Sequence, residues 1–93
     1  MSKEIKQIVK IAKALADENR FKIFTTISEK GEIACKEITL MFKLTQPTIS
    51  HHLKVLMESG LIDFRKEGQW SYFFVNKEIL DKYVSSLAEH VTQ

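Results

Sequence analysis

Short polar side chains recur along one face of a helix that the sequence predicts between Thr45 and Gly60. Thr45 favours the start of a helix, Pro47 fits its first turn, and Gly60 is the residue type that most often ends one. The apolar residues recur at the spacing of a single buried face, at Ile49, Leu53 and Leu56. The first turn and the other face carry groups that donate and accept hydrogen bonds but bear little charge, namely Gln46, Thr48, Ser50, His51 and Lys54.

Such a helix suits the major groove of double-stranded DNA. The groove is wide enough to admit a helix, and its base edges present donors and acceptors that these side chains can pair with. An ordinary amphipathic surface helix has the same periodicity, so the helix alone leaves both interpretations open. The segments on either side of it favour DNA.

These flanking segments predict a winged helix-turn-helix. Residues 35–42 read as another short helix, joined to the DNA-reading helix by a tight turn, so a helix-turn-helix is expected over residues 35–59. Two strands then surround Gly68, which can adopt the positive φ of a tight hairpin, and this wing spans residues 61–75. Five cations flank the reading helix and the wing and are expected to contact DNA phosphates: Lys36, Lys43, Lys54, Arg65 and Lys66.

Both ends of the chain are predicted to be amphipathic helices, over residues 2–16 and 77–91. The expected core stripe of the first helix consists of Ile5, Ile8, Val9, Ala12, Leu15 and Ala16. Ile11 lies outside this stripe, and the last helix is also apolar over a wider surface than one packing contact needs. Small domains often cover such a surplus by twofold association, which predicts a homodimer. A terminal helix with some exposed apolar residues is the alternative.

Arg20 and the aromatic residues of the wing are interpreted as structural. Arg20 follows Asp17, the predicted cap of a second helix, and is expected to be a surface charge, with a phosphate contact as the alternative. Trp70, Tyr72 and Phe74 alternate along one strand and are expected to pack the hairpin onto the helices. Stacking of these rings on DNA bases is the competing interpretation.

Length and composition allow one domain, residues 1–93, mainly α-helical with a small β-hairpin. Its 93 residues, 44% of them hydrophobic, suffice for a single small core. The net charge of +2 gives little general attraction to nucleic acid, so the placement of the cations matters more than their number. No stretch approaches the roughly 20 apolar residues of a membrane span. One cysteine cannot form an internal disulfide and fits a reducing compartment, so a cytoplasmic location is expected.

Three motifs, in the same order, resemble the ArsR/SmtB family of transcriptional regulators. They are L-A-D-E-N-R at residues 15–20, T-Q-P-T-I-S-H-H-L-K-V-L-M-E-S-G-L-I at 45–62, and R-K-E-G-Q-W-S-Y-F at 65–73. The resemblance implies a small winged helix-turn-helix repressor that binds DNA. It also implies a dimer formed through the first and last helices, with an operator of twofold symmetry.

The metal sites of that family are not expected in this chain. Metal-sensing relatives carry a Cys-x-Cys pair where Ala34 and Lys36 stand here, with Cys35 between them. A second family site on the last helix would need partners for Asp81 and His90, but Tyr83 and Gln93 stand at the matching positions. Soft-metal sites need several converging ligands, so no metal or other cofactor is expected.

The sequence therefore predicts a sequence-specific DNA-binding repressor of unknown signal. A winged helix used for protein–protein binding is one alternative, and a redox sensor based on the Cys35 thiol is another. An enzyme is not expected, because the adjacent histidines His51 and His52 point about 100° apart on a helix and cannot converge on one substrate.

Overall fold

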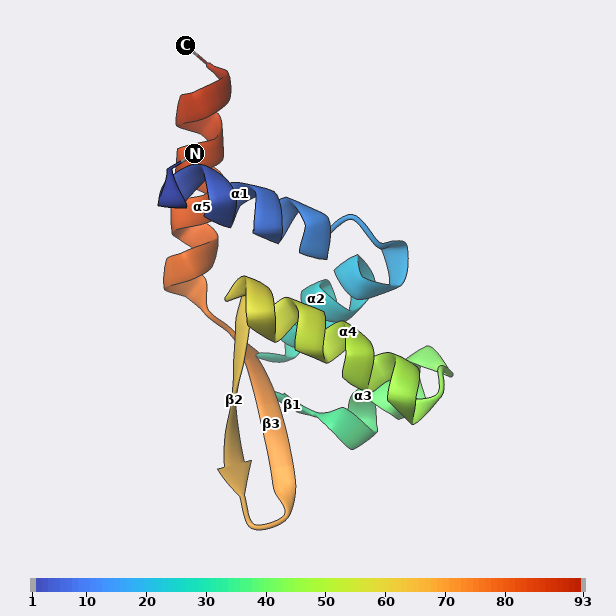
Figure 1. The fold of residues 1–93 in the computed structure, drawn as a ribbon. Helices are drawn as coiled ribbons and strands as arrows, with labels where there is room; N and C mark the ends of the chain where they lie inside the picture. The colour runs from blue at the N-terminus through green and yellow to red at the C-terminus, as the bar shows by residue number, and fades with distance from the viewer. Residues whose placement is uncertain (1, 93) are drawn as a thin grey trace.

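A three-stranded antiparallel sheet and five helices make up the fold of residues 2–92, which the computed structural model describes (Figure 1). The elements in chain order are α1 (Lys3–Ala14), α2 (Glu18–Lys30), β1 (Ile33–Ala34), α3 (Cys35–Phe42), α4 (Gln46–Ser59), β2 (Ile62–Glu67), β3 (Trp70–Val75) and α5 (Lys77–Val91). Helices α3 and α4 form the predicted helix-turn-helix, and β2 and β3 form the predicted wing.

Local side-chain chemistry sets most helix boundaries. The Asp17 carboxylate accepts the Arg20 backbone N–H at 2.9 Å, which lowers its pKa, and Asn76 accepts the Ile79 N–H at 3.2 Å. Gly60 ends α4 in the left-handed conformation with φ 89°, as predicted. Thr45 occupies the start of α4 but makes no capping bond to the backbone, because its hydroxyl pairs with that of Thr48 at 2.8 Å.

The strand β1 is absent from the sequence-based prediction, which expected a two-stranded hairpin. The sheet order is β1-β3-β2, with Ile33 opposite Phe73 and Ala34 opposite Tyr72. Two residues are too few to show the alternation by which strands are recognised in a sequence. Because α3 follows β1 directly, this short strand ties the helix-turn-helix to the wing.

The predicted core stripe of α1 is wrong in its main members. Ile11 and Ala14 are the buried residues of this helix, whereas Ile5 and Val9 are 36% and 42% exposed. Helix α1 is apolar on two sides, so periodicity could not identify the side that faces the core. The helix also ends at Ala14 rather than Ala16. Part of the apolar side that was predicted to be buried therefore lies on the surface, whereas Leu15 still packs against the core.

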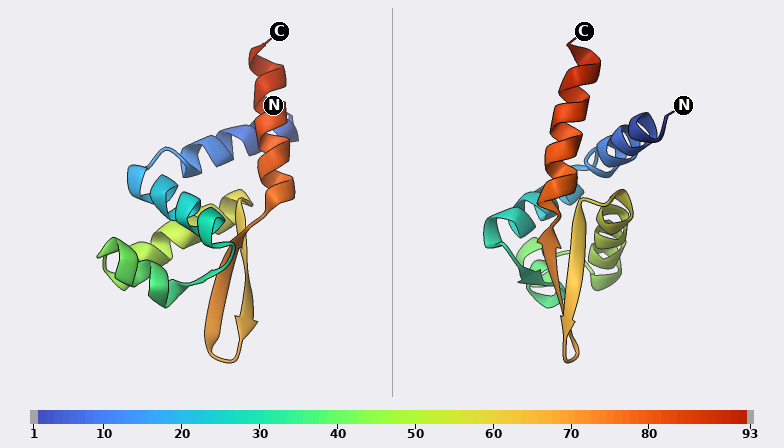
Figure 2. Two further views of the ribbon diagram at one scale, coloured as in Figure 1. Left: turned by 180° about the vertical axis from the view of Figure 1, so that it is seen from behind. Right: turned by 90° about the vertical axis from the view of Figure 1, so that its left-hand side faces the viewer.

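Helix α5 and the start of α1 project from one end of the molecule, and the wing projects from the opposite end (Figure 2). The two terminal helices pack against each other, and the buried cluster lies among α1, α2, α3, α4 and the base of the sheet. Three apolar side chains of α5 remain exposed, at Val84, Leu87 and Val91. None of the helices within residues 2–92 combines the length and the apolarity needed to cross a membrane.

Candidate nucleic-acid interface

The polar face predicted for α4 lies on the surface, and its apolar face lies in the core. Ile49, Leu53 and Leu56 are at most 2% exposed. All five residues proposed for base contact are exposed: Gln46, Thr48, Ser50, His51 and Lys54. The division of this helix into two faces is confirmed. The polar face occupies the N-terminal part of α4, over residues 46–54 of a helix that ends at Ser59, so it could follow several successive base pairs.

Arg20 fixes α4 to the rest of the molecule. Its guanidinium donates from Nε to the Ala14 carbonyl at 2.6 Å and from Nη2 to the Lys13 carbonyl at 3.2 Å. Its Nη1 lies 3.3 Å from Nδ1 of His52, a residue of α4 that is 7% exposed. The side chain thus joins the end of α1, the start of α2 and the reading helix. The expectation of a surface charge was wrong, because Arg20 is half-buried and engaged within the protein.

The contact with Arg20 also sets the protonation state of His52. A guanidinium can only donate, so Nδ1 of His52 accepts and the ring proton lies on Nε2. Burial lowers the pKa of His52, and the positive charges of Arg20 and His51 lower it further against the opposing influence of Asp17. His52 is therefore a neutral residue at the core boundary, beneath the exposed His51.

Arg65 of β2 is held by Glu32, the residue before β1. Its Nε and Nη2 each donate to a carboxylate oxygen of Glu32 at 2.8 Å, and its guanidinium lies 4.7 Å from the centre of the Tyr72 ring. These hydrogen bonds lower the pKa of Glu32 and raise that of Arg65. A DNA phosphate would therefore have to compete with Glu32 for this guanidinium.

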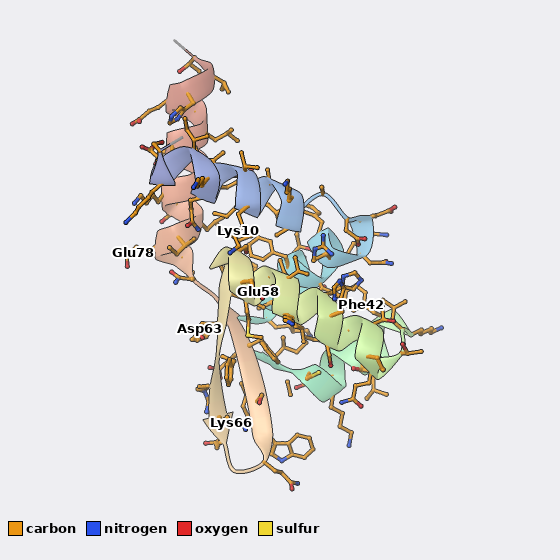
Figure 3. All side chains as sticks on the ribbon, viewed as in Figure 1. Lys10, Phe42, Glu58, Asp63, Lys66 and Glu78 are labelled. Atoms are coloured by element: carbon orange, nitrogen blue, oxygen red, sulfur yellow. The ribbon has the colours of Figure 1, made fainter. Side chains whose placement is uncertain are left out.

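Lys66 and Lys43 differ from Arg65 in being exposed without such an anchor. Lys66 projects from the wing on the strand next to the hairpin tip (Figure 3). Lys43 forms the turn between α3 and α4 and is also exposed, with a positive φ of 52°. Within residues 2–92, the ion pairs join Lys22 to Glu18 and Arg65 to Glu32 and Glu67, so neither lysine is engaged by a carboxylate.

Only some of the wing aromatics pack the hairpin onto the helices, as the sequence predicted. Phe73 is buried, Tyr72 and Phe74 are half-buried, and Trp70 is 42% exposed. Phe64 lies opposite Phe73 with ring centres 6.0 Å apart, so this pair occupies the side of the hairpin that faces the helices. Trp70 instead lies at the wing tip beneath the Lys36 ammonium, 5.6 Å from the ring centre. It does not pack into the core.

The candidate metal ligands lie apart from one another. No three His, Cys, Asp or Glu side chains within residues 2–92 lie together as metal ligands would. Cys35 is half-buried at the first position of α3, packed against the core. Nδ1 of His90 is hydrogen-bonded to the Ser86 carbonyl of the same helix at 2.7 Å. Gln93, which stands at a ligand position of the family's second metal site, lies outside the described residues.

The sequence-based prediction did not bring Lys36 and Trp70 together. Lys36 entered it as one of the cations that flank the reading helix, and Trp70 as part of an aromatic stripe. Their contact joins α3 to the start of β3, far apart in the sequence. The hairpin turn at Gly68, with φ 61°, could have indicated that the next aromatic residue lies at an exposed tip.

Known proteins are similar to this chain in sequence and in fold. Residues 17–63 match the family described as "Bacterial regulatory protein, arsR family". The arsenical resistance operon repressor of Bacillus subtilis is 36% identical over 73 residues, which are 78% of this chain and 70% of the relative. An ArsR-like transcriptional regulator from Rhodococcus superposes with a TM-score of 0.83 at 21% identity, covering 91% of this chain and 79% of that one.

A homodimeric winged helix-turn-helix DNA-binding domain from Mycobacterium bovis, a possible ArsR-family regulator, also superposes closely. Its TM-score is 0.76 at 25% identity, with 96% of this chain and 84% of that one covered. The winged helix-turn-helix fold is thereby confirmed, and so is the expectation that the protein is not an enzyme, because the family consists of regulatory proteins. The chain belongs to the ArsR family of bacterial regulatory proteins.

Proposed function

We propose that this protein is a sequence-specific DNA-binding transcriptional repressor that acts as a homodimer. The observation that carries the proposal is the exposed face of α4, where short hydrogen-bonding side chains lie opposite a fully buried apolar face. This face belongs to the second helix of a helix-turn-helix in a chain of the ArsR family. A DNA partner also supports a location in the cytoplasm.

The residues of the interface divide into two roles. Contacts to base edges are assigned to the exposed face and first turn of α4, at Gln46, Thr48, Ser50, His51 and Lys54. Contacts to phosphates are assigned to the flanking cations Lys43, Lys66 and Arg65. Arg65 should contribute least to DNA affinity, because its guanidinium is already bound to Glu32. A DNA phosphate would have to replace the Glu32 carboxylate.

The dimer is assigned to the terminal helices. Both α1 and α5 expose aliphatic side chains, at Ile5, Val9, Val84, Leu87 and Val91. These side chains lie on the two helices that pack together at the end of the molecule opposite the wing (Figure 2). The homodimeric state of the Mycobacterium bovis relative supports the same assignment here. A symmetric dimer would present two reading helices to half-sites about one helical turn apart.

A protein-binding winged helix is the less well supported alternative. Binding helices of that kind present large apolar or aromatic anchors at their centre. The exposed face of α4 carries none, and its central members are Ser50, His51 and Lys54. We therefore assign α4 to DNA rather than to a protein partner.

The experiment that tests the function is selection of bound genomic fragments followed by footprinting of the selected duplex. We expect two protected half-sites, centred about ten base pairs apart and related by a twofold axis. Sedimentation of the free chain should give twice the mass of one chain. Protection of one asymmetric half-site by a monomer would contradict the dimer, and the absence of any selected sequence would contradict sequence-specific binding.

A further inference from the structure

A hollow of about 430 Å³, lined by both polar and apolar side chains, lies between α3, the first residue of α4 and the tip of the wing. Its lining includes Lys36, Thr39, Gln46, Gln69, Trp70 and Ser71. The hollow is thus bordered both by the start of the reading helix and by the wing. The contacts to base edges and to phosphates proposed above do not use this hollow.

Lys36 and Trp70 face each other across this hollow from different elements. The Lys36 ammonium lies 5.6 Å from the centre of the Trp70 ring, and Trp70 remains 42% exposed. The attraction between a cation and a ring face is modest at exposed sites, about 0.5–1 kcal/mol, but it restricts where the flexible lysine rests. Lys36 takes part in none of the ion pairs formed by residues 2–92, so its charge is available to an external anion.

The position of the hollow determines what would occupy it when DNA is bound. A reading helix in the major groove and a wing beside it reach two adjacent grooves of the duplex. The sugar–phosphate backbone that separates those grooves must then pass between the helix and the wing. The hollow lies there, because Gln46 begins α4 while Gln69 and Trp70 end the hairpin turn.

We propose that this hollow seats the sugar–phosphate backbone of one DNA strand. The Lys36 ammonium neutralises a phosphate, and the Trp70 ring lies against the adjoining deoxyribose. The amides of Gln69 and Gln46 border the path of the strand on the wing side and the helix side. This inference rests on the proposed DNA-binding function and adds two residues, Lys36 and Trp70, from outside the reading helix and the basic positions already assigned.

Trp70 provides a direct readout, because it is the only tryptophan in the chain. DNA binding is followed by the anisotropy of a labelled duplex, and Trp70 is followed in the same samples by quenching of its fluorescence with acrylamide. We expect the quenching constant to fall by roughly half or more on binding, because interfaces exclude water and small solutes. Both the selected operator and a random duplex should produce this protection, since a backbone contact carries no sequence information.

A matched pair of charge changes tests the role of Lys36. Lys36→Gln should weaken both duplexes about equally, by roughly five- to tenfold at 0.1 M salt, and should reduce the salt slope by about 1.8, because each subunit of the dimer loses one phosphate contact. Lys22→Gln is the control, because Lys22 is an exposed lysine of α2 already paired with Glu18, and it should change neither value. Trp70→Phe should preserve the fold and lose part of the affinity for both duplexes.

The outcomes separate this inference from the function on which it rests. If the anisotropy reports binding while Trp70 stays equally open to acrylamide, the strand does not occupy the hollow, and the DNA-binding function stands. Equal salt slopes for Lys36→Gln and the native chain would likewise overturn the phosphate contact. If neither duplex binds even at low salt, the proposed function fails and this inference fails with it.

Discussion

The reading helix and the wing reach the same proposed partner, but the molecule holds them very differently. Helix α4 is fixed along its length: its apolar face is in the core, Arg20 contacts His52, and Gln7 donates to the Ser59 carbonyl at 2.9 Å. The wing is fixed at its base by β1 and midway by Glu32 and Arg65, and its residues from Phe64 to Trp70 are exposed.

The difference matches the two kinds of contact proposed. Hydrogen bonds to base edges depend on position to a fraction of an ångström, so the element that makes them gains from a rigid attachment. Contacts to phosphates depend mainly on charge, so they tolerate a mobile element.

The largest effect on stability is expected from replacing Arg20, and it should exceed the effect of replacing Arg65. Arg20→Met should lower the free energy of unfolding by about 2–3 kcal/mol, because it removes charged hydrogen bonds to two carbonyls and a buried histidine. Arg65→Met should lower it much less, since the ion pair with Glu32 is half-exposed. Urea unfolding at one protein concentration measures both. Equal losses would show that the wing is as firmly held as α4.

Base contact by α4 should be visible as a loss of specificity. Ser50→Ala and His51→Ala should each weaken binding to the selected operator by about 1–3 kcal/mol and weaken binding to random DNA much less. Ser85→Ala, an exposed serine on α5, serves as the control and should leave both unchanged. Competition binding gives the ratio of the two affinities. If Ser50 and His51 affect both duplexes alike, they contact phosphates and the assignment to bases is wrong.

Within the wing, Lys66 should matter more than Arg65. Lys66→Ala should reduce the salt slope of DNA binding by about two units, one for each subunit of the dimer, whereas Arg65→Ala should reduce it less, because Glu32 competes for that guanidinium. Glu32→Gln should then strengthen binding by releasing Arg65. Titrations at several salt concentrations test all three variants. A Glu32→Gln protein that binds more weakly would indicate that the pair positions the wing instead.

The attachment of α4 should weaken in acid. The pKa of His52 is lowered in the folded protein below its ordinary value of 6.5, so the unfolded chain binds the proton more readily. Neutral His52 therefore contributes its full stability above pH 6.5, the pKa of the unfolded chain. This contribution decreases as the pH falls from 6.5 through the lower pKa of the folded protein. His52→Asn, which cannot titrate, should flatten the pH profile of unfolding in this range. An unchanged profile would exclude His52 as the source.

Metal ions should have the smallest effect, on either region. Arsenite, zinc, cadmium and copper should leave the operator complex intact, because release requires several ligands that favour one conformation, and residues 2–92 bring no three together. Anisotropy titration with a chelator control measures this. Histidines of two subunits could still meet across a dimer, so stoichiometric release that the chelator reverses would overturn the prediction. His90 would then be the first residue to change.

Sequence reasoning succeeded where one element carried its own pattern. The two faces of α4, its end at Gly60 and the hairpin turn at Gly68 each follow from local residue types, and the structure confirms all three. The motifs shared with the family added the correct fold. Such features are predictable because neighbouring residues in the chain determine them.

The errors arose where distant segments decide the outcome. Helix α1 offers two apolar sides, and only its packing against the other helices selects the side of Ile11 and Ala14. Arg20 resembles any surface cation until His52 is brought beside it. Likewise β1 exists because β3 supplies its hydrogen-bonding partner. Tertiary contacts of this kind leave no periodic trace in one sequence.

Lys43 links the stability of the turn between α3 and α4 to its proposed contact with DNA. Its φ of 52° and ψ of 32° place an L-residue in a conformation that costs roughly 1 kcal/mol compared with glycine. A glycine here would relax the turn and remove the charge at the same time, so thermal stability and DNA affinity should move in opposite directions at this one position. Selection for a more heat-resistant protein would therefore be expected to produce a poorer repressor if it acted on residue 43.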